Sequence, residues 1–397
     1  MRPVFPYGRF SVVALAAAFL AGCATGPTEA EKEAARVAYE AAVIAAQAPP
    51  PINLNQSVVQ AAAVYMAFSR DMAAIEGGFT SPEQIQAALR RGASYDPDQI
   101  SRGLVAYASI IALQSPEFVT GVRSMADDRT TREKLVADIV ANPAHASSLP
   151  GAEAAAGLVM ATLSADIGAL GRAANSIEND AYAIQARYDP RRGWGVAEVS
   201  DRVGRLEAAK ARSTEIVRPS PEEASRLFAA AHSGGGALPV SGEPRKPPYP
   251  PAVVNALALA ALASLGYAGE NAQANTDALQ FDRVSHGCLT MAKLNLFQCL
   301  AASRPNYEDM FCLGRHIVRD LATCSRGAAM PAPIVTVSDV IPVEPAVSDA
   351  APIIITPPPA AAAPITIAPV PTPVAPPARE PSLTERLNSR PAGQSGD

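Results

Sequence analysis

Aromatic residues are scarce in this sequence, and their scarcity limits the fold. Phenylalanine, tyrosine and tryptophan together make up 5% of the 397 residues, whereas hydrophobic residues as a class reach 48%. Alanine dominates that class. A β-sandwich needs more aromatic and β-branched residues, so the composition favours closely packed helices. We expect an all-α fold organised as a bundle of helical hairpins.

Excess positive charge is also lacking. The formal net charge of −5 gives the protein no broad basic surface. Nucleic-acid binding is therefore not expected, because such proteins neutralise phosphates with clustered lysine and arginine. The length permits two or three domains.

Catalytic signatures are missing as well. The only histidines are His145, His232, His286 and His316. No Gly-x-Ser-x-Gly sequence occurs, and the glycine run at 233–236 lacks the lysine of a phosphate-binding loop. We therefore assign no catalytic residue, no metal ligand and no cofactor. The sequence favours a protein without enzymatic activity but leaves an enzyme open.

Three weaker candidates for chemistry remain, each with a simpler structural interpretation. Glu76 precedes a glycine pair, which is where a cell-wall-cleaving enzyme would place a catalytic glutamate near a helix end, but the surrounding residues match no such motif and favour a solvated glutamate. The turn with Arg191, Arg192 and Trp194 is either a recognition loop for an anionic or sugar ligand or a turn whose tryptophan packs back. A pocket beside the C-terminal cysteines is the third candidate, with surface placement as the alternative; its residues are His286, Arg315 and His316.

The N-terminus has the pattern of an export signal. Arg2 and Arg9 form a positively charged region before an apolar run from Phe10 to Leu20, and this run has the length of a signal-peptide core. The next residues complete Leu20-Ala21-Gly22-Cys23, which resembles the lipobox of bacterial lipoproteins. The resemblance covers only the first two dozen residues. The alternative is an ordinary secretory signal in which the cysteine is incidental.

The lipobox resemblance implies how the chain is anchored. Residues 1–22 would be a signal peptide, and Cys23 would carry diacylglycerol and a further acyl chain such as palmitate. More than one acyl chain gives stable membrane anchoring. Ala24 at the next position implies the outer membrane, facing the periplasm, in lipoproteins of this type. The expected location is therefore the cell envelope.

No second apolar run is long enough to span a membrane without interruption. The best candidate, Ala154 to Leu170, contains Ser164 and Asp166. We expect the mature protein to be soluble apart from its lipid.

Residues 23–52 are expected to form the lipid anchor and a stalk helix. Thr28 and Glu31 have the spacing of a capping box, in which each side chain accepts from the other's backbone amide. Apolar residues then recur at helical spacing, at Val37, Ala41, Ile44 and Ala48. The sequence leaves open whether this helix is a free stalk or docks on the body.

Residues 53–232 are expected to form a helical body. Four helix starts place a capping residue before proline, at Ser81-Pro82, Asp96-Pro97, Ser115-Pro116 and Ser220-Pro221. One long helix is expected from Ala152 to Tyr188 and another from about Val196 to Val217, paired as an antiparallel hairpin.

The remaining chain divides by composition. Residues 233–251 are rich in glycine and proline and indicate a linker. Residues 252–327 form a second helical region, which begins with a buried helix over Val253–Leu265. From 328 to 397 proline and alanine dominate, so we expect a disordered, extended tail.

The four remaining cysteines sit in two predicted helices, 286–303 and 307–324, joined by a turn at Pro305. An even set of cysteines in an oxidising compartment indicates disulfides. Cys288 and Cys299 lie about 16 Å apart on one helix, too far for a bridge. Folding the two helices back at Pro305 brings Cys299 beside Cys312 and Cys288 beside Cys324. This predicts two nested bridges, Cys288–Cys324 and Cys299–Cys312, in a stapled hairpin spanning 286–324. A metal site formed by His286, Cys288, Cys312 and His316 is the alternative.

These features predict an envelope-anchored structural or adaptor lipoprotein whose specific role is open. It would be tied to the membrane by its lipid and would hold or bridge an envelope protein or cell-wall partner, with the tail reaching that partner. The alternative is an envelope enzyme or ligand-binding subunit, for example one directed at the cell wall. A deep pocket with clustered titratable side chains would favour the alternative.

Overall fold

The computed structural model describes residues 28–47, 50–187, 189–215 and 217–332. Over these residues the chain is helical, and its two β-bridges, Leu54 with Ala268 and Glu198 with Pro305, lie outside any strand. The predicted all-α fold is confirmed. The signal peptide, Cys23 and residues 333–397 of the predicted tail lie outside the described residues.

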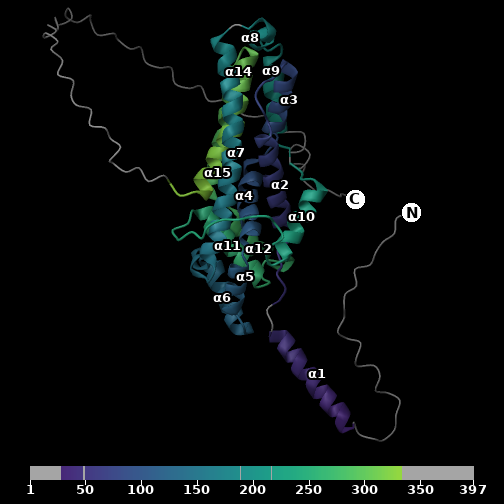
Figure 1. Cartoon of the computed structure of the whole chain (residues 1–397). Helices are drawn as coiled ribbons and strands as arrows, with labels where there is room; N and C mark the ends of the chain where they lie inside the picture. The colour runs from purple at the N-terminus through teal and green to yellow at the C-terminus, as the bar shows by residue number, and fades with distance from the viewer. Residues whose placement is uncertain (1–27, 48–49, 188, 216, 333–397) are drawn as a thin grey trace, which may run out of the picture. The chain divides into compact units, whose positions relative to one another are not determined.

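The α-helices are connected by turns, three 3₁₀ segments and one longer irregular segment between α10 and α11 (Figure 1). In the first half of the chain they are α1 (Glu29–Gln47), α2 (Gln56–Ala73), α3 (Pro82–Ala93), α4 (Pro97–Ala112), α5 (Pro116–Ser124), α6 (Arg129–Ala141) and α7 (Ala152–Ala186). In the second half they are α8 (Gly193–Val196), α9 (Arg202–Arg212), α10 (Pro221–His232), α11 (Pro251–Ser264), α12 (Gln273–Gln280), α13 (Arg283–Ala302), α14 (Asn306–Leu313) and α15 (Asp320–Ala329). The 3₁₀ segments are η1 (Pro143–Ser148), η2 (Pro190–Arg192) and η3 (Glu270–Ala272).

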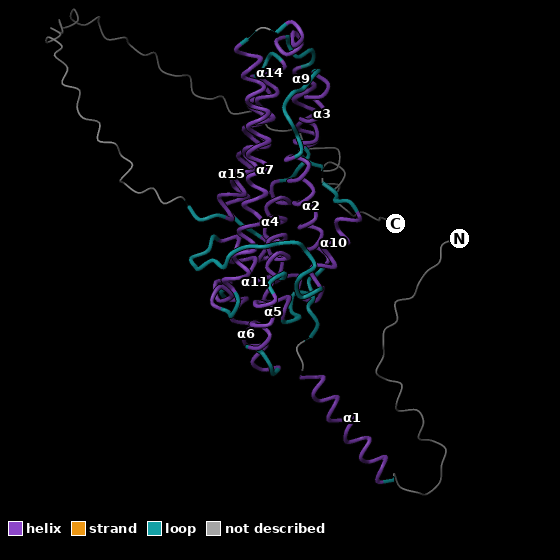
Figure 2. The backbone as a smooth tube through the Cα atoms, viewed as in Figure 1, coloured by secondary structure: helices purple, strands orange, loops and turns teal. Residues whose placement is uncertain are grey.

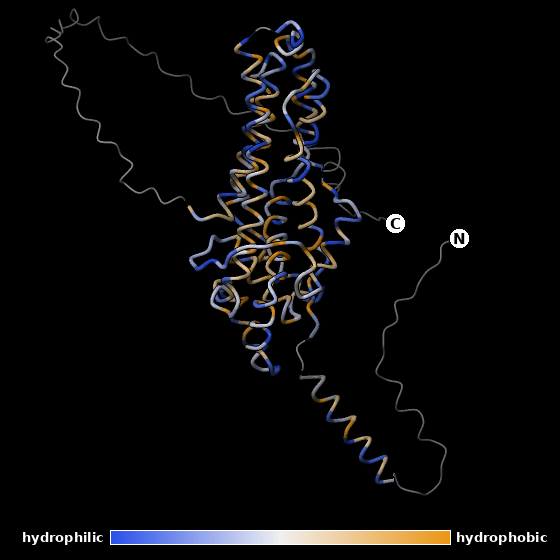
Figure 3. The backbone as a smooth tube through the Cα atoms, in the orientation of Figure 1, coloured by the Kyte–Doolittle hydropathy of each residue, from blue (hydrophilic) through white to orange (hydrophobic). Residues whose placement is uncertain are grey.

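Two helices without a polar face form the centre of the bundle. Every residue from Gly103 to Ala112 of α4 is buried, and so is every residue from Ala256 to Ser264 of α11. Helix α4 packs against α2, α7 and α11. A helix that is apolar all round must be covered on all sides. Figure 3 shows hydrophobic residues gathered on these inner helices, and the predicted buried helix at 253–265 is confirmed.

Helix α7 is the long helix predicted from Ala152, and it ends at Ala186. It is also the one described helix that is long and apolar enough to cross a membrane. Core helices of soluble proteins meet the same criteria of length and composition. Helix α7 lies against α2, α4, α14 and α15 within the bundle, and 44% of its most apolar window is buried. Packing in the core therefore accounts for the buried part of its apolar sequence.

The predicted helix starts follow the capping rules. Asp96, Ser115 and Ser220 each accept a hydrogen bond from the backbone amide three residues on, with proline in the first turn. Ser81 occupies the same position before α3 but makes no side-chain cap. At α1 the capping box is complete: the Thr28 amide donates to Glu31 Oε2 at 2.7 Å, and the Glu31 amide donates to Thr28 Oγ1 at 3.3 Å.

The predicted hairpin between α7 and a helix over 196–217 is wrong. Only Arg202–Arg212 forms a helix of useful length there, and it packs against α3 and α13. Asp201 caps a fresh start by accepting from the Gly204 amide at 2.8 Å. Of the residues of α9 only Arg205 and Ala209 are buried, and Leu206 is partly buried against the core, so the helix has no continuous apolar stripe with which to cover α7.

The glycine- and proline-rich segment 233–250 forms neither helix nor strand (Figure 2). It runs across α7, where the Arg245 amide donates to the Glu153 carbonyl at 2.9 Å. At the crossing the Glu243 backbone lies so close to Gly157 that a β-carbon there would collide with it. The described helices on both sides belong to one compact unit.

The C-terminal cysteines form the predicted nested bridges. Cys288 pairs with Cys324 and Cys299 with Cys312, with Cα–Cα distances of 5.4 and 5.7 Å. Helix α13 is the first arm of the stapled hairpin. The second arm is α14, a π-helical segment from Gly314 to Arg319, and α15. The metal alternative is thereby contradicted, because Cys288 and Cys312 belong to different disulfides and neither offers a thiolate.

Lys293 on α13 ties the stapled hairpin to the end of α3. Its ammonium donates to the Ala93 carbonyl at 2.7 Å and the Tyr95 carbonyl at 2.5 Å, and lies 3.6 Å from the centre of the Tyr95 ring. The side chain is buried, and this burial lowers the pKa of Lys293 to about 7, although Asp96 acts in the opposite direction.

The lowered pKa of Lys293 predicts that stability increases with pH in the alkaline range. Between about pH 7 and the ordinary lysine value of 10.5, the unfolded chain binds a proton that the folded chain lacks. The free energy of unfolding should therefore rise by up to about 1.4 kcal/mol per pH unit, and stay flat for this group below pH 7. Urea unfolding of wild type and Lys293→Met at pH 6.5, 8 and 9 measures this difference. Parallel pH profiles for the two proteins would contradict it.

Candidate functional site

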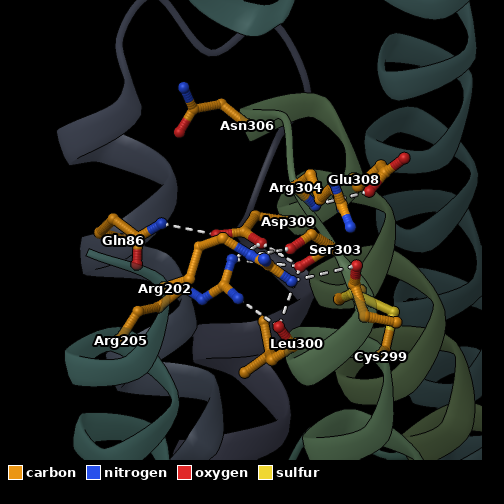
Figure 4. Close-up of polar contacts among 12 residues, drawn as sticks. Gln86, Arg202, Arg205, Cys299, Leu300, Ser303, Arg304, Asn306, Glu308 and Asp309 are labelled. Carbon is orange, nitrogen blue, oxygen red and sulfur yellow. Dashed lines mark hydrogen bonds and ion pairs between the residues drawn. A yellow bond between two sulfur atoms is a disulfide. The ribbon is translucent and has the colours of Figure 1, made fainter. Parts of the chain in front are cut away.

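A buried ion pair lies beneath the turn of the stapled hairpin. Arg205 of α9 pairs with Asp309 of α14, with side-chain exposures of 5% and 0% (Figure 4). The sequence analysis did not identify either residue. They lie 104 positions apart, and no local pattern links a helix arginine to one acidic side chain among many.

Further hydrogen bonds satisfy most of the polar atoms of this pair, and Arg205 Nε is the one buried atom of the pair without a partner among the described residues. The Ser303 hydroxyl donates to Asp309 Oδ1 at 2.7 Å, and Gln86 of α3 donates to Asp309 Oδ2 at 2.7 Å. Arg205 also donates to the Leu300 carbonyl and to Ser303 Oγ. A buried carboxylate and guanidinium are tolerated only when neighbouring groups satisfy them in this way. The cluster therefore joins α3, α9, α13 and α14 at the hairpin turn.

A second arginine of α9 caps the first arm of the hairpin. Arg202 donates to the carbonyls of Ser303 and Ala301 at 2.9 Å each. The last carbonyls of a helix have no partners within it, and a cation at this end also interacts favourably with the helix dipole. Arg202 and Arg205 are thus both directed into the turn from the α9 side, as Figure 4 shows.

On the α7 side of the hairpin the surface opens into a pocket of about 460 Å³, here called the hairpin pocket. Its most distinctive lining residues are Tyr182, Gln185, Tyr307, Glu308 and Phe311, next to the Cys299–Cys312 disulfide. The rings of Tyr182 and Phe311 have centroids 5.8 Å apart and are tilted by 60°. The arrangement offers aromatic faces, one amide and one carboxylate to a ligand.

A smaller hollow of about 270 Å³ lies between α2 and α7. Arg70 and Asp166 line it together with Ser69 and several alanines. Burial raises the pKa of Asp166, and the nearby Arg70 guanidinium opposes that shift. Arg70 also lies 3.7 Å from Glu223 of α10, so its charge is shared between two carboxylates.

The histidines and the arginine predicted for a pocket near the cysteines do not line the hairpin pocket. His316 instead lies 3.2 Å from Asp320 within the second arm, and the His286 ring lies 5.7 Å from that of Phe281. Arg315 is exposed on the π-helical segment. Within the described ranges, no three histidine, cysteine, aspartate or glutamate side chains are grouped to hold a metal ion.

The structural interpretation fits the other two candidates better than the chemical one. Arg192 makes a two-point ion pair with Asp180 at 2.6 and 2.8 Å, and the Trp194 side chain packs against the core. The glycine after Glu76 docks on α7, where its amide donates to Ser176 Oγ at 3.0 Å. The segment with Arg192 and Trp194 is therefore a folded turn, and the segment after Glu76 fixes the position of a helix end.

The glycine run at 233–236 is part of a turn held by a buried side chain. Gly234, Gly235 and Gly236 have positive φ angles, which only glycine adopts without strain. Gln114 accepts from the Ala237 amide at 3.0 Å and donates to the Ala230 carbonyl at 3.1 Å. The run therefore bends the chain after α10.

The fold and these sites define a helical bundle with a disulfide-stapled hairpin and an aromatic pocket beside it. No protein-family model, no curated protein and no solved structure matches the chain.

The buried cluster predicts that removing one charge lowers the free energy of unfolding more than removing both charges. Asp309→Asn leaves the Arg205 cation without its counter-charge and should lower the free energy of unfolding by about 3–5 kcal/mol. The double variant Arg205→Met, Asp309→Leu removes both charges and should cost markedly less, because no buried charge is left unpaired. Urea unfolding measures both.

The matched control is Arg129→Met, which breaks an exposed pair with Glu133 and should leave the unfolding midpoint unchanged. A double variant as unstable as Asp309→Asn would show that the cluster contributes through shape and not through charge pairing.

Proposed function

We propose that the protein is a lipid-anchored adaptor of the bacterial cell envelope, which holds or bridges other envelope components. The observation that carries the proposal is the pairing of all four cysteines in the described part of the chain. Stable disulfides are typical of proteins outside the cytoplasm. They therefore agree with the export implied by the lipobox resemblance at 20–23, which lies outside the described residues.

The region next to the proposed anchor supports an extended attachment. Helix α1 begins a few residues after Cys23 and carries exposed apolar side chains, with Val37 53% and Tyr39 71% exposed. Its other faces carry ion pairs between neighbouring turns, Lys32 with Glu29 and Arg36 with Glu33 and Glu40. Such pairs support a helix that receives little help from tertiary packing.

The sequence of the tail supports a partner at a distance. Residues 328–378 contain no lysine or arginine and are rich in proline and alanine. A polyproline-type chain rises about 3.1 Å per residue, so fifty residues would reach up to about 150 Å when fully extended. We propose that this segment gives the adaptor its reach toward a partner protein or the cell wall.

A ligand-binding subunit is the second candidate function. The observation that favours it is the hairpin pocket, whose size falls within the usual range for small-molecule sites. An adaptor and a ligand-binding subunit differ in what they need: the first requires the tail and the lipid, and the second requires the pocket.

The adaptor proposal is tested by capture of partners from cross-linked cell envelopes. Three forms are compared: the full lipidated chain, a variant that lacks residues 333–397 and so keeps α15 intact, and Cys23→Ala. The full chain should co-purify a specific envelope protein or cell-wall fragment, and the tail-less variant should lose it while remaining in the membrane fraction. Cys23→Ala should leave the membrane fraction and lose palmitate labelling.

Failure of the full chain and the tail-less variant to capture any specific partner would contradict the adaptor function. Membrane retention of Cys23→Ala would contradict the anchor, separately from the adaptor role.

A further inference from the structure

The hairpin pocket directs three aromatic side chains and one carboxylate at the same space. Tyr307 and Phe311 are four residues apart on α14 and therefore share a face, and Glu308 lies beside them. Tyr182 comes from the opposite wall, on α7, and is 51% exposed. The lining thus combines groups from two elements that are far apart in sequence.

The aromatic part of the lining offers ring faces to a cation. Tyr182 and Phe311 pack on each other, with ring centroids 5.8 Å apart and planes tilted by 60°, and Tyr307 lines the same pocket. The face of an aromatic ring is electrically negative, and a cation within about 6 Å of the ring centre is attracted to it. Aromatic faces beside a carboxylate therefore suit a cationic group such as an ammonium.

The charges around the pocket point the same way. Glu308 contributes a carboxylate to the lining, and its Oε2 accepts from the Arg304 amide at 2.7 Å. Two of the neighbouring cations are directed elsewhere, since Arg205 pairs with Asp309 and Arg202 caps carbonyls at the end of α13. Arg304 is exposed and lies beside Glu308 (Figure 4). In Figure 4 Glu308 lies on the opposite side of the turn from Gln86 and Arg205.

We propose that the hairpin pocket binds the ammonium group of a lysine side chain presented by a partner protein. The aliphatic part of the lysine would pack on the rings of Tyr182 and Phe311, and the ammonium would meet the Glu308 carboxylate. This assignment goes beyond the adaptor function and does not depend on the lipid anchor or the tail. A neutral sugar is the competing ligand, since aromatic rings and a carboxylate also suit one.

The proposal is tested with a small probe, Nα-acetyl-lysine methylamide, whose side-chain ammonium is free. The probe is titrated into the full chain in detergent, and binding is followed by ligand-observed NMR. Its uncharged counterpart, N-acetyl-norleucine methylamide, has the same aliphatic chain without the ammonium. We expect saturable binding of the lysine probe and binding of the norleucine probe that is at least about 5-fold weaker, the ratio typical of a cation on aromatic rings.

Two variants locate the binding. Glu308→Gln removes the charge but keeps an oxygen that can accept from the Arg304 amide, so the hairpin turn is preserved. It should weaken the lysine probe about 5-fold and leave the norleucine probe unchanged. Tyr182→Leu alters an exposed ring and should weaken the lysine probe about 3-fold or more. Tyr39→Leu on α1 is the matched control and should have no effect.

Equal affinity for the two probes, or a lysine affinity that Glu308→Gln leaves intact, would overturn the proposal. Saturable binding of N,N′-diacetylchitobiose without binding of the lysine probe would overturn it in favour of a sugar site. Loss of partner capture in the envelope experiment would contradict the adaptor function alone, because the probe titration needs no partner.

Discussion

The covalent pairing of two antiparallel arms about the turn at Pro305 is the constraint on which the rest of this structure depends. Cys299–Cys312 closes the hairpin near the turn and Cys288–Cys324 closes it near the open end. With both ends fixed, α14 cannot rotate freely about its axis. Helix α14 therefore presents Asp309 to α3 and α9, while Tyr307 and Phe311 line the pocket shared with α7.

The buried polar groups around the hairpin define its position more than they add to stability. Removing a carboxylate and a guanidinium from water costs several kcal/mol for each ion, and a well-packed apolar pair is often as stable. What Arg205, Asp309 and Lys293 provide is a set of directional contacts that a slipped hairpin would leave unsatisfied. A role in positioning thus explains why charges lie at the centre of an alanine-rich bundle.

Much of this architecture follows from local sequence patterns. The caps at Asp96, Ser115 and Ser220, the long helix from Ala152 and the nested disulfides each depend on a few neighbouring residues or on symmetry about one turn. Those signals survive folding because capping and chain reversal are local events.

The features that sequence analysis missed depend on residues far apart in the chain. Helix α9 has no continuous apolar stripe, so its packing is decided by Arg202 and Arg205 finding partners near residue 300. The hairpin pocket joins Tyr182 to Phe311, and the π-helical segment at 314–319 has no sequence signature that we could recognise. The resemblance of residues 20–23 to a lipobox suggested a compartment outside the cytoplasm, and through it the interpretation of the cysteines, but carried no information about what the helices recognise.

The central claim is that the disulfides hold the hairpin turn and its pocket, while the inner helices α4 and α11 stand without them. Amide hydrogen exchange measured by mass spectrometry, on the full chain before and after reduction and alkylation, tests it directly. Exchange should accelerate over residues 306–313 of α14 and stay slow over residues 103–112 of α4. Unchanged protection of α14 after reduction would contradict the claim, and so would loss of protection in both helices together.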